Sequence, residues 1–418
     1  MMLPSYTPPS PPPRYLRTAG HGETSLAHTP GERPAPTSTF TKHEGRTSII
    51  LDSQEDNIER PSYGRHGVVS GVIYFENPSI VAEVVIKLEG KLEISLLSTG
   101  DSMSYKTLNT HCHLTWQTSG NGTTCPNLVP FRFHLPPTFE YEQEYHPMPP
   151  SYEILSPGSS GQFVRCRYQL VVAITKRRSA VSLMRDKIMT IPFNYYPRMR
   201  PEMPIVSDGH DFFASIKMNP GEWHQATSQS QPSSGHLSPI TVDFFIPATR
   251  IFAITDIIPF HIQLSGDISS MRAFFPELPP EVYPPTLQPL KASWKRKKPR
   301  WKFLRLLLMR RVSVQIHGQT SENNAQTSEG TILPLPPDIF AVSESQELQL
   351  HWEGEITGGP NLAVGSFSVP NLSVRDVLVL ALTPASKSLF LEAKCIVPIR
   401  LVTDTWSGAD TSQSQAAV

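Results

Sequence analysis

The segment 81–97 constrains the fold more than any other part of the sequence, because its hydrophobic residues recur at every second position. The even-numbered positions carry aliphatic side chains and one glycine, whereas most odd-numbered positions carry Glu, Lys or Ser. A period of two places alternate side chains on opposite faces of a β-strand, while an amphipathic helix needs a period near 3.6. The segment is therefore predicted to be a long strand with one face on a hydrophobic core and the other in water.

Similar patterns recur along the chain, separated by turn residues and not by helical patterns. In the first half the predicted strands cover 131–135, 163–175 and 188–195. In the second half they cover 212–218, 240–246, 257–264, 312–316, 348–352 and 389–402. The polar stretches 219–238 and 317–330 are interpreted as long loops. Short strands without intervening helices indicate antiparallel β-sandwiches.

The length of 418 residues is sufficient for more than one domain. Residues 1–46 are rich in Pro, Ser, Thr and Gly and poor in aliphatic residues, so they are predicted to form a disordered tail. We predict an all-β chain with two tandem antiparallel β-sandwich domains, over 47–200 and 201–405. A second disordered tail is predicted at 406–418.

Charge and cysteine content narrow the function classes. Lys+Arg and Asp+Glu balance at 37 each, which argues against bulk attraction to nucleic acid. The N-terminus lacks the apolar run of a signal peptide, and no stretch approaches the ~20 apolar residues of a membrane-spanning helix.

Cys166 and Cys395 lie in the apolar phase of predicted strands and are expected to be buried, whereas Cys112 and Cys125 flank a turn and can pair. A soluble intracellular chain is expected.

Motifs for catalysis are absent from the sequence. It contains no G-x-S-x-G, no Walker A loop, no H-E-x-x-H and no glycine-rich dinucleotide fingerprint. His111 and His113 share one side of a predicted strand, with Cys112 on the other side, and are interpreted as surface histidines. We expect a protein that is not an enzyme and that uses no cofactor or metal.

The order of several segments resembles the arrestin family, in particular the fungal α-arrestins. In the first half the resemblance rests on 67–75, 84–90, 131–137, 149–153, 164–171 and 194–201. In the second half it rests on 258–266, 311–317 and 364–370. No phosphate-sensing core of acidic and basic residues, like that of the visual arrestins, can be assigned. The resemblance implies an arrestin fold and an adaptor that links membrane-protein cargo to ubiquitin-ligase and endocytic machinery, at the plasma membrane or endosomes.

Two short motifs in the N-terminal tail match ligands of WW domains, one of the P-P-x-Y type and a weaker L-P-x-Y variant. Their docking residues are Pro12, Pro13 and Tyr15, and Leu3, Pro4 and Tyr6. A proline-rich segment is already close to polyproline II, so docking into an aromatic groove costs little ordering entropy, and two nearby motifs add avidity. The resemblance implies that they recruit a HECT-type ubiquitin ligase. The alternative is that a proline-rich tail contains such tetrapeptides by chance.

A third P-P-x-Y match covers Pro149–Tyr152. It lies where the arrestin pattern has a structural turn between two strands. Tyr152 is therefore expected to pack on the sandwich and not to bind a partner.

A dense basic run with interleaved aromatic residues lies in the second half. Its charged residues are Lys295, Arg296, Lys297, Lys298, Arg300 and Lys302. Such a loop suits anionic lipid headgroups, where each charge contributes about 1 kcal/mol, or the acidic tails of cargo proteins. The alternatives are a nuclear localisation signal and a solvated loop.

Two other functions remain open. A trafficking scaffold of the same fold can act on endosomes without ubiquitin, like the arrestin-fold retromer subunit. A nuclear β-sandwich protein can bind nucleic acid through 295–302, with a steep dependence on salt. The partners we expect are a WW-domain ligase, cytosolic tails of membrane proteins and an anionic lipid surface, and not nucleic acid.

Overall fold

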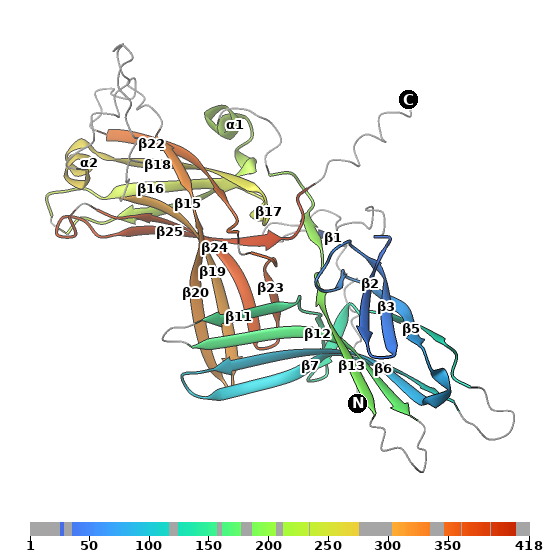
Figure 1. Ribbon diagram of the computed structural model, residues 1–418. Helices are drawn as coiled ribbons and strands as arrows, with labels where there is room; N and C mark the ends of the chain where they lie inside the picture. Colours follow the sequence, from blue (N-terminus) through green and yellow to red (C-terminus); the bar gives the residue numbers. More distant parts are fainter. Residues whose placement is uncertain are drawn as a thin grey trace, which may run out of the picture.

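The computed structural model describes residues 26–28, 36–116, 124–156, 161–176, 186–205, 212–233, 235–275, 303–334, 347–360, 362–384 and 386–406. Within these residues the chain is mostly β-strand, and its sheets fall into two groups (Figure 1). Each group contains two sheets with a hydrophobic core between them. The predicted all-β fold with two tandem sandwiches is confirmed.

The first half consists of a six-stranded sheet and a four-stranded sheet, antiparallel except for the β4–β13 pair. The larger sheet contains, in order, β4 (Ser62–Tyr63), β13 (Lys187–Tyr195), β12 (Gln162–Lys176), β6 (Val81–Leu96) and β7 (Asp101–Thr115), with β11 (Tyr152–Ser156) paired to β12. The smaller sheet contains β2 (Ser38–Glu44), β3 (Thr47–Gln54), β5 (Val68–Phe75) and β8 (Leu128–His134). A hairpin of β9 (Thr138–Tyr141) and β10 (Glu144–Pro147) and the 3-10 turn η1 (Pro78–Ile80) complete this half.

The alternation in 81–97 corresponds to β6, the central strand of the larger sheet. Val84, Ile86, Leu88, Leu92 and Ile94 are fully buried, while the residues between them reach the surface. Burial of each such side chain stabilises the fold by about 1.5–3 kcal/mol. The inward face thus holds the two sheets of the first half together.

The second half repeats this arrangement with two further sheets. One contains, in order, β15 (Trp223–Ser230), β16 (Ile240–Pro247), β18 (Ile257–Asp267), β22 (Glu347–Thr357) and β21 (Thr331–Pro334). The other contains β17 (Ile251–Ala253), β25 (Ala393–Val402), β24 (Leu372–Leu382), β19 (Leu304–Ile316) and β20 (Gln319–Glu329), with β23 (Phe367–Val369) paired to β24. Two short helices, α1 (Phe212–Met218) and α2 (Ile268–Phe274), and the 3-10 turn η2 (Pro220–Glu222) lie outside the sheets.

The prediction of a strand at 212–218 is wrong, because this segment is helix α1. Phe212 and Ser215, three residues apart, form its buried side. Phe212 stacks on His261 of β18 with ring centroids 3.7 Å apart. A window of seven residues is too short to separate a period of two from a period near 3.6, so the tertiary contact decides the conformation.

The predicted loops at 219–238 and 317–330 are also wrong in part, because they contain strands β15 and β20. Both strands are rich in Gln, Ser, Thr or Asn and lie at the edges of their sheets. An edge strand buries little of its surface and so needs few apolar residues, which makes its composition resemble that of a loop. The strand predicted at 389–402 begins four residues later, at Ala393 of β25.

The strands of the first sandwich begin before residue 47, the predicted boundary of the disordered tail. Strand β2 pairs with β3 from Ser38 onward. Further upstream, β1 (Leu26–His28) pairs antiparallel with β14 (Met199–Pro201), the strand that connects the two halves. The segment that precedes the first sandwich therefore returns to the connection between the halves.

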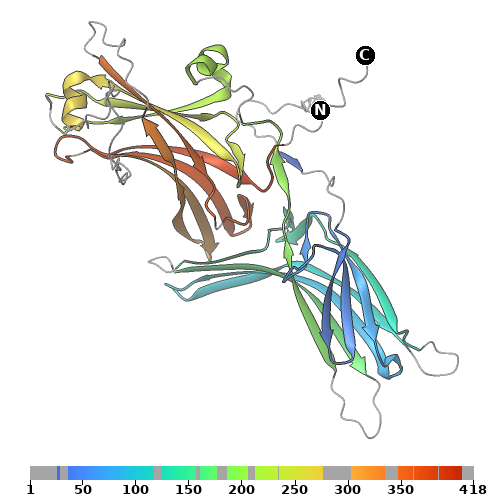
Figure 2. The ribbon, with the colours of Figure 1, turned by 45° about the horizontal axis from the view of Figure 1, so that its top comes forward.

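The two halves interlock through strands that extend beyond their own sandwiches (Figures 1 and 2). Second-half residues belong to the same buried cluster as the core of the first half: Val312, Val314, Ile316, Val369, Leu372 and Val374. Polar contacts surround this shared core. Tyr105 donates a hydrogen bond of 2.6 Å to the carbonyl of Pro370, and Gln162 donates one of 2.9 Å to Ser321. The halves are thus joined by a hydrophobic interface and not by the connecting strand alone.

Candidate functional site

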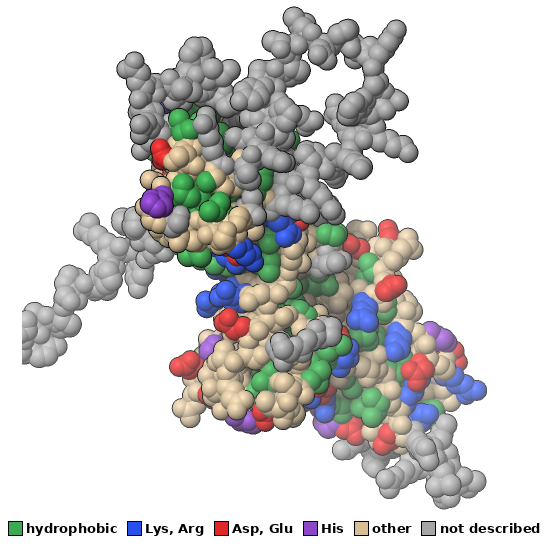
Figure 3. All heavy atoms as spheres, turned by 90° about the vertical axis from the view of Figure 1, so that its left-hand side faces the viewer, with side chains coloured by type: hydrophobic (Ala, Val, Ile, Leu, Met, Phe, Trp, Pro, Cys, Tyr) green, Lys and Arg blue, Asp and Glu red, His purple; other side chains and the backbone are tan. Residues whose placement is uncertain are grey.

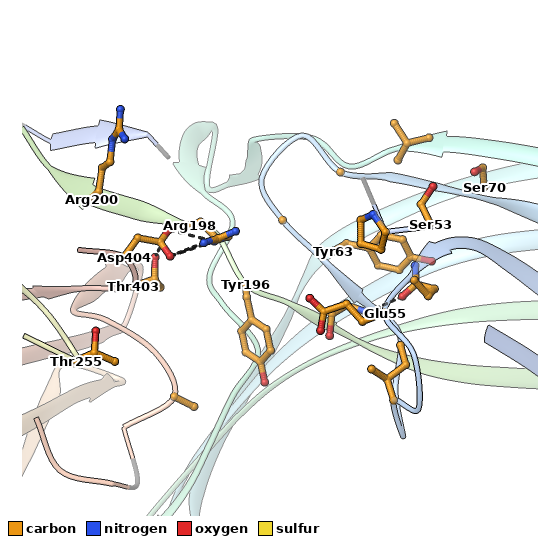
Figure 4. Close-up of a pocket in the computed structure, with 18 of the residues that line it drawn as sticks. Ser53, Glu55, Tyr63, Ser70, Tyr196, Arg198, Arg200, Thr255, Thr403 and Asp404 are labelled. Atoms are coloured by element: carbon orange, nitrogen blue, oxygen red, sulfur yellow. Dashed lines mark hydrogen bonds and ion pairs between the residues drawn. The ribbon is translucent and has the colours of Figure 1, made fainter. Parts of the chain in front are cut away.

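A cleft with a volume of about 1300 Å³ lies where the two halves meet beside the connecting strand β14. Its walls come from 53–55 and 62–70 of the first half, from 196–200 of the connection, and from 403–405 after β25 (Figure 4). These segments are far apart in the sequence, so the cleft exists only when both sandwiches have folded and docked.

A bidentate ion pair fixes the wall on the side of the second half. Arg198 donates hydrogen bonds of 2.6 and 3.1 Å to the two carboxylate oxygens of Asp404. Thr403 accepts a hydrogen bond of 2.8 Å from the Met199 amide. Figure 4 shows the Arg198 side chain reaching Asp404 while Arg200 points away from that pair. These contacts join the connecting strand to the end of β25.

The opposite wall carries polar side chains from the loop after β3 and from β4 and β5. In Figure 4, Glu55 points into the cleft from the side opposite Arg198, and Tyr63 and Ser53 lie near it. The Tyr63 hydroxyl is buried without a hydrogen-bond partner in the described chain, and its burial raises the pKa of that phenol well above the usual range. A buried hydroxyl without a partner is costly, and a ligand with a donor or acceptor can satisfy it.

Beside the cleft, strand β14 pairs with an extended segment of this chain, β1. In the β1–β14 ladder, Ala27 is opposite Arg200 and Leu26 is opposite Pro201. Backbone pairing of this kind is how sheet edges accept extended peptides. Within the described segments, no three His, Cys, Asp or Glu side chains are grouped to hold a metal ion.

The predicted docking motifs lie outside the described residues. This applies to the WW-domain residues Pro12, Pro13 and Tyr15 with the variant at Leu3, Pro4 and Tyr6, and to the basic run Lys295, Arg296, Lys297, Lys298, Arg300 and Lys302. Those hypotheses therefore stay predictions. Figure 3 shows acidic and basic side chains intermixed over the first half, in keeping with the balanced net charge.

The structural interpretation of Pro149–Tyr152 is confirmed. The Pro149 carbonyl accepts a hydrogen bond of 2.6 Å from the Tyr168 hydroxyl, and Ser151 bonds the backbone of Tyr195. Tyr152 makes an edge-to-face contact with Phe367 of the second half, with ring centroids 5.4 Å apart, and its burial raises the pKa of its phenol to about 12. The motif belongs to the interface between the halves.

The histidine and cysteine predictions are resolved by the strands that carry them. His111 and His113 are exposed on β7, and His113 pairs with Glu83 of β6. All four cysteines are free thiols, so Cys112 and Cys125 do not pair. Cys166 and Cys395 are buried as predicted, and burial raises the pKa of the Cys166 thiol to about 12.

Sequence reasoning missed a buried ion pair at the end of the second sandwich nearest the first. Arg310 of β19 donates two hydrogen bonds of 2.9 Å to Asp376 of β24, and Ser366 donates a third to the same carboxylate. Arg310 occupies the inward phase of its strand, between Leu308 and Val312. The available signal in the sequence is a charged residue in the apolar phase of an alternating segment.

Comparison with known proteins gives no relative for this chain: no protein-family model matches it, and no curated protein matches it. No helix among the described residues is long and apolar enough to cross a membrane.

Proposed function

We propose that this protein is an arrestin-like adaptor that binds cytosolic tails of membrane proteins in the cleft between its sandwiches and recruits a WW-domain ubiquitin ligase through its N-terminal tail. It acts in the cytoplasm and is recruited to the plasma membrane or to endosomes. The observation that carries the proposal is the pairing of an extended segment, β1, with β14 beside the cleft.

The architecture supports an adaptor because it combines two docked sandwiches with a connecting strand that pairs with an extended segment. The shared core holds the two sandwiches in one orientation, and the Arg198–Asp404 pair anchors the connecting strand. An extended tail can exchange for β1 by forming the same backbone hydrogen bonds, while the charged walls select among sequences.

The cleft is tested with an array of immobilised peptides from cytosolic tails of membrane proteins, probed with the full chain. Glu55→Lys reverses a charge that lines the cleft, and Glu59→Lys makes the same change at an exposed residue four positions away that does not line it. We expect Glu55→Lys alone to change which peptides bind. Identical binding by wild type and both variants contradicts a role for the cleft.

Ligase recruitment is tested separately with an array of isolated WW domains. Tyr15→Ala removes the aromatic side chain that fills the second pocket of a WW groove, so binding to the array should be lost, while Tyr6→Ala should reduce only the binding of tandem WW domains. Unchanged binding of Tyr15→Ala contradicts the docking motif. Tail binding without WW binding favours the ubiquitin-independent scaffold.

A further inference from the structure

Strands β19 and β24 are apolar on both faces over part of their length. Residues 304–309 and 377–382 carry apolar side chains at every position except Arg305. In β6, by contrast, most outward positions carry Glu, Lys or Ser. A sheet face in water normally shows polar residues at alternate positions, and continuous apolar runs are typical of strands that are covered on both faces. The outer face of the β19–β24 sheet therefore has the composition of a face that another element covers.

Strand pairing collects the outward residues of β19, β24 and β25 into two apolar rows, and Figure 1 shows β19 and β24 side by side. The residues that lie opposite one another are Leu307, Val379 and Ile396 in one row, and Met309, Val377 and Pro398 in the next. Their neighbours along the strands, such as Leu308 and Leu378, belong to the core of the second half. The two rows therefore face away from that core. These six residues are called the outer apolar patch.

The outer apolar patch reaches the surface of the protein. Ile396 is 54% exposed, and Val377 is the least exposed of the six, at 9%. Leu307, Met309 and Val379 are half-buried. Single exposed apolar residues are common on protein surfaces, whereas a contiguous group of them marks an interaction site. The patch therefore has the properties of a binding surface.

Arginines form one border of the outer apolar patch. Arg311 lies directly opposite Arg375, and Arg400 of β25 is at the same level on the third strand. Two carboxylates are close to this border: Glu322 approaches Arg311 at 3.9 Å, and Asp376 is held in the buried ion pair described above. Arg375 is exposed, and the Arg400 Nε is buried without an acceptor among the described residues. The arginine border therefore keeps a net positive charge.

The opposite border of the patch is electrically balanced. Arg305 and Lys394 lie at this level of β19 and β25. Arg305 pairs with Glu329 at 2.8 Å, and Lys394 pairs with Glu392 at 3.3 Å. The surface is thus asymmetric, with an apolar centre, a cationic border on one side and a neutral border on the other. A partner with an apolar face and one acidic flank complements it.

We propose that the outer apolar patch is the docking site of an amphipathic α-helix from a partner protein, with the acidic flank of the helix against Arg375 and Arg400. A helix that lies across the strands advances about 5.4 Å per turn, close to the spacing of about 4.8 Å between strands. Apolar residues at i, i+3 or i+4, and i+7 then meet β19, β24 and β25 in turn. The two rows are about 7 Å apart, within the diameter of about 10–12 Å of a helix.

Two other occupants fit the surface less well. A second copy of this chain carries the same net positive border and lacks the acidic flank that complements it. A flat membrane meets Ile396 before it reaches Val377, whereas the side chains of a helix can pack between them. The patch shares no residue with the cleft, so this inference does not depend on the proposed function.

The test uses the full chain and a fluorescent peptide of about 15 residues that forms an amphipathic helix with leucines on one face and glutamates on one flank. Anisotropy titrations compare it with a peptide of the same composition in scrambled order. We expect only the amphipathic peptide to bind, and Ile396→Asp to weaken its binding about 10-fold or more. Ile257→Asp is the matched control, because Ile257 is 55% exposed and lies on β18, in the other sheet of the same half.

A charge exchange tests the orientation of the helix. Arg375→Glu should weaken binding of the acidic peptide and strengthen binding of a version with lysines in place of the glutamates, because Arg375 is exposed and faces the acidic flank.

Several results overturn the proposal. They are equal binding of the amphipathic and scrambled peptides, absence of binding by both, and equal loss in Ile396→Asp and Ile257→Asp. A dimer of the full chain that Ile396→Asp dissociates, measured by analytical ultracentrifugation, overturns it in favour of a second copy. Binding to phosphatidylserine vesicles without binding of the peptide overturns it in favour of a membrane surface.

Discussion

Replacement of Asp376 by Asn should destabilise the second half strongly, because it leaves a buried guanidinium without its counter-charge. Arg310 is 5% exposed and Asp376 is 0% exposed, and two hydrogen bonds of 2.9 Å join them. Each charge-assisted hydrogen bond contributes about 1.5–3 kcal/mol, and removal of one partner from a buried pair costs about 3–5 kcal/mol. Ser366 can still donate to the amide oxygen, so most of the loss comes from Arg310.

Urea unfolding followed by tryptophan fluorescence measures this effect, since Trp352 lies in the core of the second half. With an m value of about 2 kcal/mol per M, a loss of about 3–5 kcal/mol lowers the midpoint by roughly 1.5–2.5 M. The double variant Arg310→Met, Asp376→Leu should lose less than the sum of its single variants. Arg305→Gln breaks an exposed pair and should cost at most about 1 kcal/mol. A shift in Asp376→Asn no larger than in this control, or strict additivity in the cycle, refutes the reasoning.

Three other changes probe the packing. Burial, reinforced by the nearby His351, lowers the pKa of His261 to about 3. As the pH falls below about 6.5, the unfolded state therefore binds a proton that the folded state does not, and the fold loses stability. Urea titrations should show about 2 kcal/mol less stability at pH 5 than at pH 8, and this difference should be absent in His261→Phe. Gly71→Ala places a Cβ 2.0 Å from the backbone oxygen of Ile50 in β3. We expect the free energy of unfolding in urea to fall by about 1–3 kcal/mol. An unchanged urea midpoint argues against that close approach. Tyr105→Phe removes the hydrogen bond to Pro370 between the halves and should cost about 1 kcal/mol in the same assay, while a neutral effect indicates that water replaces the hydroxyl.

The strands with one fully buried face were predictable from the sequence, and those with little buried surface were not. In β6 and β12 the alternation of residues such as Leu88 and Leu170 reflects one face on a continuous core, so the period of two is visible without a structure. The edge strands β15 and β20 bury too little to show that period. Helix α1 depends on the stacking of Phe212 upon His261, a contact that local sequence does not contain.

The cleft could not be predicted, because it is produced by strand pairing and by the docking of the two halves. Arg198 and Asp404 are 206 positions apart and meet only through the docking of the connection against the end of β25. The docking motifs of the tail, in contrast, are linear and are visible in the sequence alone.

The shared core has a consequence for the order of events during synthesis. The strands of the first half leave the ribosome before β19 and β24, whose Val314 and Val374 complete their hydrophobic cluster. About 170 residues separate the end of β14 from Val374, which corresponds to roughly 10–35 s at the usual 5–20 residues per second. During that interval the nascent chain exposes apolar surface that these later strands do not yet cover, and such surface favours aggregation.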